Sequence, residues 1–149
     1  MTAPAHSQHW RLMEGVRVKV KWLDRGVLMT PYLALCVTED EYHATLKHRK
    51  FSGDIPSFTG SGHDGATTHI LSDCHGSLVC LVNCHFETKD AAQVAALMAH
   101  EAVHVWKAQM DDIGEDCPGE EIEAYGIQNI TQTLYAEAIR RGLADEPQG

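Results

Sequence analysis

Apolar positions change their spacing along the chain, and each spacing predicts one kind of element. Residues 32–37 form a short apolar run after Pro31, which is typical of a buried strand. Thr38 and Glu41 match the capping-box pattern, which predicts a helix over residues 39–50. Residues 67–72 and 78–84 are two further strand-like runs, and the turn-forming stretch 73–77 between them predicts a hairpin.

The second half of the chain predicts two long helices. Residues 89–111 carry apolar side chains on every side of a helical projection, so we expect a helix buried in the middle of the domain, with Thr88 as its N-cap. Residues 114–118 contain glycine and proline and should end that helix. A last helix is predicted over residues 119–141, with Gly142 as its stop signal.

Three segments are less regular. Residues 1–15 have the character of a loosely held terminus, and residues 16–20 alternate apolar and basic side chains, as a short edge strand would. Residues 51–66 are rich in Gly, Ser and Thr and lack periodicity, so this long connection is either a functional loop or a plain surface excursion. Together the elements predict one α+β domain over residues 1–149, in which a short sheet with a hairpin packs on the buried helix and on a C-terminal helix.

Composition places the chain among globular proteins. Of the 149 residues, 44% are hydrophobic and 22% are charged, which is ordinary for a folded domain. The chain has no run of apolar residues long enough for a transmembrane helix, and residues 1–15 lack the apolar core of a signal peptide, so we expect a cytoplasmic protein with no membrane partner. The five cysteines show no framework spacing and are expected to be reduced thiols.

Charge is divided unevenly between the two parts of the chain. Residues 1–50 hold eight Lys/Arg and five Asp/Glu, whereas residues 51–149 hold four and sixteen, which gives +3 and −12 and the total of −9. The acidic part argues against nucleic acid as a partner, because phosphate binding needs a basic surface. The basic run 47–50 is better explained as a helix end, where cations are favoured.

One motif in the predicted helix 89–111 carries specific chemistry, the sequence His100-Glu101-Ala102-Val103-His104. Residues four apart lie nearly above one another on an α-helix, so the two imidazoles can bind one zinc ion, with Glu101 within reach of a metal-bound water. In a histidine-rich chain the alternative is a chance match. In a buried helix, however, these side chains would lack partners, at a cost of about 1–3 kcal/mol each. The motif therefore predicts a zinc site.

A catalytic zinc ion usually has three protein ligands and one open position, so a third ligand is needed. The predicted last helix carries an apolar stripe of Ile127, Ile130, Leu134 and Ala138. One turn before that stripe lies Glu123, whose carboxylate should project toward the motif helix. Glu120 could substitute for Glu123, and Glu121 is the weakest candidate because it points about 100° away from Glu120. The alternative is that Glu123 only interacts favourably with the helix dipole.

Cysteines offer a competing zinc site, made from Cys74, His75, Cys80, Cys84 and His85. Their spacing contains no C-x-x-C pair, and residues 78–84 have the pattern of an apolar strand, in which successive side chains face opposite ways. Core cysteines are the better account of this stretch.

The motif and Glu123, with eighteen residues between them, resemble the gluzincin metallopeptidases, whose aminopeptidase branch has a glutamate ligand at that separation. The stretch 114–128 is similar to small metallopeptidases encoded in tailed-phage and prophage genomes. The resemblance covers residues 67–141 and implies a small zincin-like domain. It also implies one catalytic Zn²⁺ ion per chain, bound by His100, His104 and Glu123, and Glu101 as the general base. The expected activity is hydrolysis of a peptide bond by a zinc-bound water, in the cytoplasm of a bacterium or a phage-infected host.

This chain departs from the gluzincin pattern at Ile127, where those enzymes often carry an acidic residue that orients a zinc-bound histidine. That role would pass to Asn129, Asp111 or a backbone carbonyl. Four side chains are candidates for stabilising an oxyanion, namely Tyr32, His85, Tyr125 and Tyr135.

Two functions therefore remain. One is a zinc peptidase acting on a peptide or protein substrate, and the other is a catalytically weak or inactive zincin-fold module that captures a protein partner. For the peptidase, strand 78–84 is a candidate open edge on which an extended peptide could add. The acidic surroundings favour a basic or neutral peptide.

Overall fold

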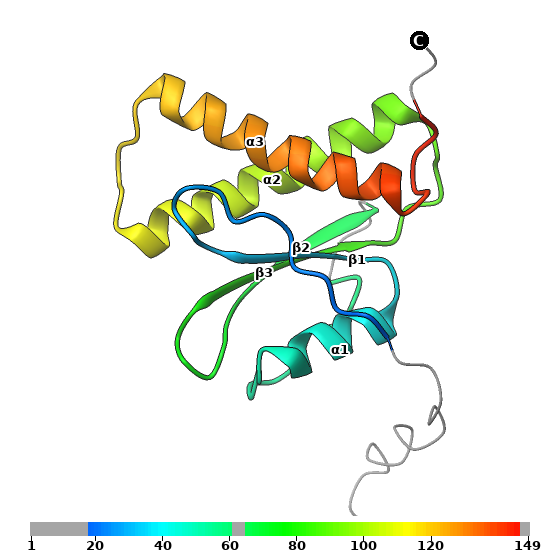
Figure 1. Ribbon diagram of the computed structural model, residues 1–149, viewed down its shortest axis with the longest axis horizontal. Coiled ribbons are helices and arrows are strands. Elements are labelled where there is room, and N and C mark those ends of the chain that lie inside the picture. Colours follow the sequence, from blue (N-terminus) through cyan, green and yellow to red (C-terminus); the bar gives the residue numbers. More distant parts are fainter. Residues whose placement is uncertain (1–17, 61–64, 147–149) are drawn as a thin grey trace, which may run out of the picture.

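The computed structural model describes residues 18–60 and 65–146, which form an α+β fold (Figure 1). The elements in chain order are β1 (Tyr32–Cys36), α1 (Glu39–His48), β2 (Ala66–Ser72), β3 (Leu78–Cys84), α2 (Ala91–Ile113) and α3 (Glu120–Arg140). These six predicted elements are confirmed, and their ends differ from the predicted ones by at most two residues. Residues 18–20 form no strand, so the edge strand predicted over residues 16–20 is wrong for its described part. The predicted loose terminus 1–15, residues 16 and 17, and part of the predicted loop (61–64) lie outside the described residues.

Local hydrogen bonds explain where the helices begin. The Thr38 hydroxyl accepts from the Glu41 backbone N–H and the Glu41 carboxylate accepts from the Thr38 N–H, both at 3.2 Å, which confirms the capping box. Helix α2 begins later than predicted because its N-cap is Asp90, whose carboxylate accepts from the Gln93 N–H at 2.9 Å. Thr88 instead accepts a hydrogen bond from the Asp90 N–H.

The three strands form one sheet in the order β1-β3-β2. Strand β1 is parallel to β3, and β2 is antiparallel to it, with Thr68 opposite Val82. Strand β3 is therefore paired on both sides, and the prediction that residues 78–84 present an open edge is wrong. The parallel pairing of β1, which reaches β3 from far away in the sequence, occupies that edge, so β2 is the outer strand on this side.

Helices cover both faces of the sheet, with α2 and α3 on one face and α1 on the other (Figure 1). Alternate residues of β3 face opposite ways, as the pleat requires. Cys80, Val82 and Cys84 pack with α2 and α3, whereas Val79 and Leu81 pack with α1. Within the described residues no helix is both long and apolar enough to cross a membrane.

Helices α2 and α3 lie side by side along much of their lengths. Leu134 and Ala138 are fully buried in their shared core, and Ile127 and Ile130 pack against it, so the apolar stripe predicted for the last helix is confirmed. Near the start of α3, Gly126 lies directly on the Trp106 ring, and an added Cβ at that glycine would overlap the ring.

Polar contacts hold both ends of the described chain to the rest of the fold. Glu137 of α3 accepts a hydrogen bond from the Lys21 ammonium at 2.7 Å. Arg141, at the end of α3, forms an ion pair with Glu41 of α1 at 2.6 Å. The Asp145 backbone N–H donates to the Lys89 carbonyl at 3.0 Å, just before α2.

Candidate metal centre

The motif lies in the middle of α2, and both of its histidines are exposed. This corrects the expectation of a helix buried on all sides. The sheet covers one side of α2 and α3 covers another, while the side that carries His100 and His104 faces solvent. Of the three motif side chains only Glu101 is buried, with 3% of its surface exposed.

The two imidazoles are brought together as the helical spacing predicts. Their Nε2 atoms are 3.3 Å apart and their rings meet edge to face. Two nitrogen ligands of a tetrahedral zinc ion, with bonds of about 2.0–2.1 Å, are themselves about 3.3 Å apart. A hydrogen bond between the rings would be slightly longer than the usual range of roughly 2.7–3.2 Å. The separation is therefore compatible with two nitrogen ligands of one zinc ion and with a long hydrogen bond between the rings.

Glu101 points from α2 toward the sheet, where Thr68 of β2 holds it. The Thr68 hydroxyl donates to Glu101 Oε2 at 2.5 Å. Thr68 lies opposite Val82, and Val82 faces α2, so its hydroxyl is on the helix side of the sheet. The sequence reasoning missed Thr68. The signal was present in the strand alternation, because Thr68 shares a face with the buried Ala66 two residues earlier.

The third predicted ligand is placed differently. Glu123 lies in the first turn of α3 and is partly exposed, while Glu120 and Glu121 are exposed. Within residues 18–60 and 65–146, no three His, Cys, Asp or Glu side chains are gathered closely enough to hold a metal ion. The structure thus brings His100 and His104 together but does not bring Glu123 to them.

A hollow of about 430 Å³ adjoins the histidines, between α2 and the β2–β3 hairpin. His104, Lys107 and Asp111 of α2 line one side of it, and Ile70 of β2, which is 51% exposed, lines another. Asp111, a candidate for orienting a histidine, therefore lies in the same hollow as His104. The hollow also borders β2, the strand at the outer side of the sheet.

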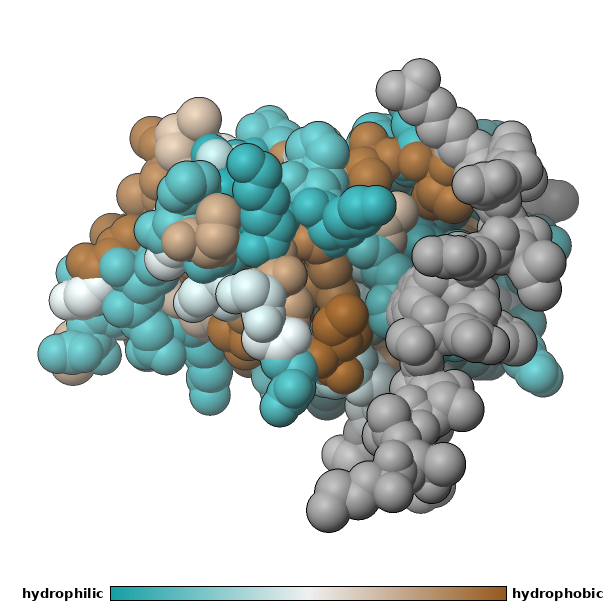
Figure 2. All heavy atoms as spheres, turned by 90° about the horizontal axis from the view of Figure 1, so that it is seen from below, coloured by the Kyte–Doolittle hydropathy of each residue, from teal (hydrophilic) through white to brown (hydrophobic). Residues whose placement is uncertain are grey.

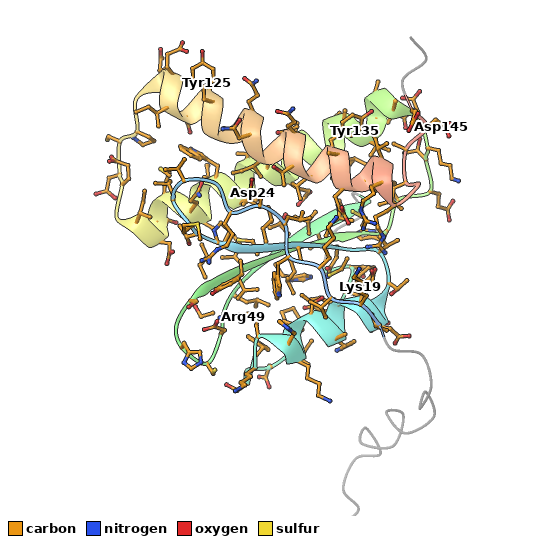
Figure 3. The ribbon with its side chains drawn as sticks, in the orientation of Figure 1. Lys19, Asp24, Arg49, Tyr125, Tyr135 and Asp145 are labelled. Carbon is orange, nitrogen blue, oxygen red and sulfur yellow. The ribbon has the colours of Figure 1, made fainter. Side chains whose placement is uncertain are left out.

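Most of the other candidate side chains lie elsewhere. Tyr32 and His85 are on the α1 side of the sheet, where Tyr32 packs with the α1 core and His85 contacts Thr67 and Phe58. Tyr125 and Asn129 line a separate groove between α3 and the loop that carries Asp24. Figure 3 labels Tyr125 on α3 and Asp24 on this loop. Tyr135 packs against the core between the helices and the sheet.

All five cysteines are free thiols. Cys36, Cys80 and Cys84 are buried, which raises the pKa of each thiol to about 12. The prediction of core cysteines is therefore confirmed for Cys80 and Cys84 and wrong for Cys74, which is exposed. Cys74 and His75 lie in the hairpin turn, whereas Cys84 ends β3 at the opposite end of the hairpin. The competing zinc site therefore does not assemble.

The described site consists of two exposed imidazoles at zinc-ligand separation, a buried carboxylate held from the sheet, and a hollow beside an outer strand. Each of these parts follows from the way α2 lies across β2 and β3. No protein-family model, curated protein or solved structure matches this chain.

Proposed function

We propose that this protein is a zinc-dependent peptidase of zincin-like fold, in which His100 and His104 bind the metal. The observation that carries the proposal is the 3.3 Å separation of the two Nε2 atoms on the exposed side of α2, which fits a tetrahedral zinc ion. Both rings are accessible to an incoming ion, since both residues are exposed. Bound zinc would supply Lewis-acid chemistry, namely polarisation of a carbonyl and a lowered pKa of water.

Glu101 is the proposed general base. Its carboxylate would take a proton from the attacking water and pass that proton to the leaving amine. The hydrogen bond from Thr68 fixes one carboxylate oxygen, so the side chain stays oriented without needing to be reorganised during the reaction. Burial of Glu101 also keeps bulk water away from the carboxylate, which strengthens its interaction with a developing charge.

Glu123 is the proposed third ligand. It is on the helix that packs along α2, and within the described residues its carboxylate forms no ion pair that would have to be broken. It is also partly exposed, so its side chain has room to change rotamer on metal binding.

An extended peptide is the proposed substrate, and β2 is its proposed docking strand. The free side of an outer strand offers unpaired backbone N–H and C=O groups on which a peptide can add as a further strand. The hollow between β2 and α2 would accept a substrate side chain beside His104. Its acidic wall, Asp111, favours a neutral or basic side chain there.

A second candidate function is supported by Ile127. This side chain packs against the hydrophobic core and is apolar, so it cannot orient a zinc-bound histidine as an acidic residue would. The alternative proposal is a zincin-fold module that binds zinc and captures a protein partner without cleaving it.

Metal analysis combined with a peptidase assay tests both proposals. We expect one zinc ion per wild-type chain, loss of zinc in His100→Ala and in His104→Ala, and retention of zinc in Glu101→Gln. His75→Ala is the matched control, because it removes an exposed histidine from the hairpin turn and should leave zinc binding unchanged. Glu123→Gln should weaken zinc binding by at least about 10–100-fold, the range seen when only a partner that orients a ligand is lost.

Cleavage of an unstructured protein by the zinc-loaded wild type, lost at least about 100-fold in Glu101→Gln, would support the peptidase. Zinc binding by the wild type with equal, background cleavage by wild type and Glu101→Gln would favour the binding module. A wild-type protein that takes up no zinc, or whose zinc binding survives His100→Ala, would contradict both.

A further inference from the structure

A second hollow lies on the other side of α2 from the histidines. It is a groove of about 700 Å³ between the loop over residues 24–31, α2 and residues 122–136 of α3. On α2 the groove is lined by Val105 and Gln109, which point about 100–140° away from His104 around the helix axis. The groove and the candidate metal centre are therefore two separate surfaces.

Large apolar side chains surround this groove and are exposed. On the loop, Val27 is 98% exposed and Leu28 46%, and on α3, Ile122 is 64% and Tyr125 61% exposed. Trp106 lies at the base and is itself buried. Figure 2 shows hydrophobic side chains exposed at the end of the molecule where α2 is connected to α3. Such a gathering of exposed apolar side chains around a groove is typical of an interaction surface.

Acidic residues flank the part of the groove that Ile122 lines. Residues 115–123, which run from the connection into the first turn of α3, contain five Asp/Glu and no Lys, Arg or His. Within the described part of the chain none of these five carboxylates belongs to an ion pair. Asp24, which lines the groove from the loop, adds a further negative charge.

The basic residue that lines the groove, Arg25, does not offset this charge at the rim. Its guanidinium carbon lies 3.9 Å from the centre of the Tyr32 ring, and Tyr32 packs with the core on the α1 side of the sheet. The Arg25 guanidinium therefore stacks on the Tyr32 ring. The groove presents apolar side chains within a negative field.

We propose that this groove docks a basic amphipathic segment of another protein, with its apolar side chains in the groove and its Lys or Arg side chains against residues 115–123. Helix-in-groove recognition uses this combination of apolar anchors on one face and charges beside them. A second copy of this chain is a poorer occupant, because each copy would bring the same acidic rim to the interface. Anionic membranes and nucleic acids are disfavoured by the same charge.

Titration with a synthetic helix, leucines along one face and lysines along the other, tests the proposal. We expect saturable binding to the full chain that weakens as salt is raised, because the charge contacts are at the surface. Ile122→Asp should weaken binding at least about tenfold, as expected when an apolar anchor is removed. Reversing charge with Glu120→Lys plus Glu121→Lys should weaken binding and reduce its salt dependence.

Matched controls distinguish binding in the groove from nonspecific hydrophobic binding. Ile55→Asp changes an apolar side chain of similar exposure (48%) that lies outside the groove, and it should bind like wild type. A peptide of the same composition, shuffled so that leucines share no face, should bind more weakly. The proposal would be overturned if the helix did not bind or if the shuffled peptide bound equally well. It would also be overturned if a peptide with glutamate in place of lysine bound more tightly, or if the wild-type chain formed a dimer that Ile122→Asp abolished. All of the variants lie at exposed positions, and thermal unfolding checks that each is folded.

Discussion

Two buried carboxylates of this domain, Glu137 and Glu101, accept hydrogen bonds that compensate for their burial. Glu137 is only 5% exposed, yet it accepts hydrogen bonds from Arg140 at 2.8 Å and from Lys21 at 2.7 Å. The hydrogen bond from Arg140, opposed by burial and reinforced by Lys21, lowers the pKa of Glu137 to about 2. Glu101 is likewise buried, and its partner is a neutral donor, the Thr68 hydroxyl.

Glu137→Gln should destabilise the protein at neutral pH and make its stability less sensitive to acid. The pKa of Glu137 is lower in the folded chain than its ordinary value of 4.5, so its stabilisation is complete above that value and is lost as pH falls toward 2. We expect a loss of about 1–3 kcal/mol at pH 7, less than the whole pKa shift implies because both cations are largely exposed. Urea unfolding of wild type and variant at neutral and acid pH measures this.

The exposed Glu87→Gln serves as control and should show no such pH-dependent difference. A Glu137→Gln variant whose stability falls as steeply as that of the wild type between pH 5 and 2 would contradict the assignment.

Secondary structure elements were predictable where their signals are local. The capping box at Thr38, the hairpin turn and the αL glycine that ends α2, Gly114, each act within a few residues, and the corresponding elements are confirmed. The parallel pairing of β1 with β3 was not predictable, because it joins segments separated by α1 and β2. Without that pairing, β2 could not be recognised as an outer strand of the sheet. The exposure of His100 and His104 was missed for the same reason, since it depends on which side of α2 faces α3.

The contact between α2 and α3 depends on one glycine. Gly126→Ala should destabilise the domain by about 1–3 kcal/mol, partly offset by the better helix propensity of alanine, because the added methyl group meets the Trp106 ring. In a Trp106→Leu background the same substitution should cost less, since the ring is gone. Thermal or urea unfolding of the four proteins of this cycle gives the coupling.

An equal cost of Gly126→Ala in both backgrounds would show that the ring is not what constrains this glycine. Because Trp106 also forms the base of the groove, the Gly126→Ala variant should weaken binding of the leucine–lysine helix as well.

At the scale of the whole molecule, the composition predicted a globular domain with an acidic part, but it did not predict where on the surface the acidic and apolar side chains lie. The charge asymmetry was evident from the sequence, but its concentration beside an apolar groove required knowing that α3 packs on α2 next to residues 24–31. The five cysteines were expected to be thiols, and the fold adds that three of them lie within the packed layers while Cys74 and Cys117 are exposed.

Thiol labelling measures which of the five cysteines are accessible to solvent. In the native protein a thiol reagent such as Ellman's should react quickly with two cysteines, Cys74 and Cys117, because burial raises the pKa of the other three thiols and hides them. All five should react in denaturant. Rapid labelling of a third cysteine in the folded protein, located by mass spectrometry, would contradict the described packing.

The polar contacts near both ends of the described chain limit how far this domain can be shortened and where a fusion partner can be attached. Lys21 near one end and Arg141 near the other each hold a different element, through Glu137 and Glu41, and Asp145 holds the segment before α2. A deletion that enters residues 21–145 from either side would remove at least one of these contacts. Affinity tags and fusion partners are therefore best attached outside that interval, and the smallest version worth expressing keeps it whole.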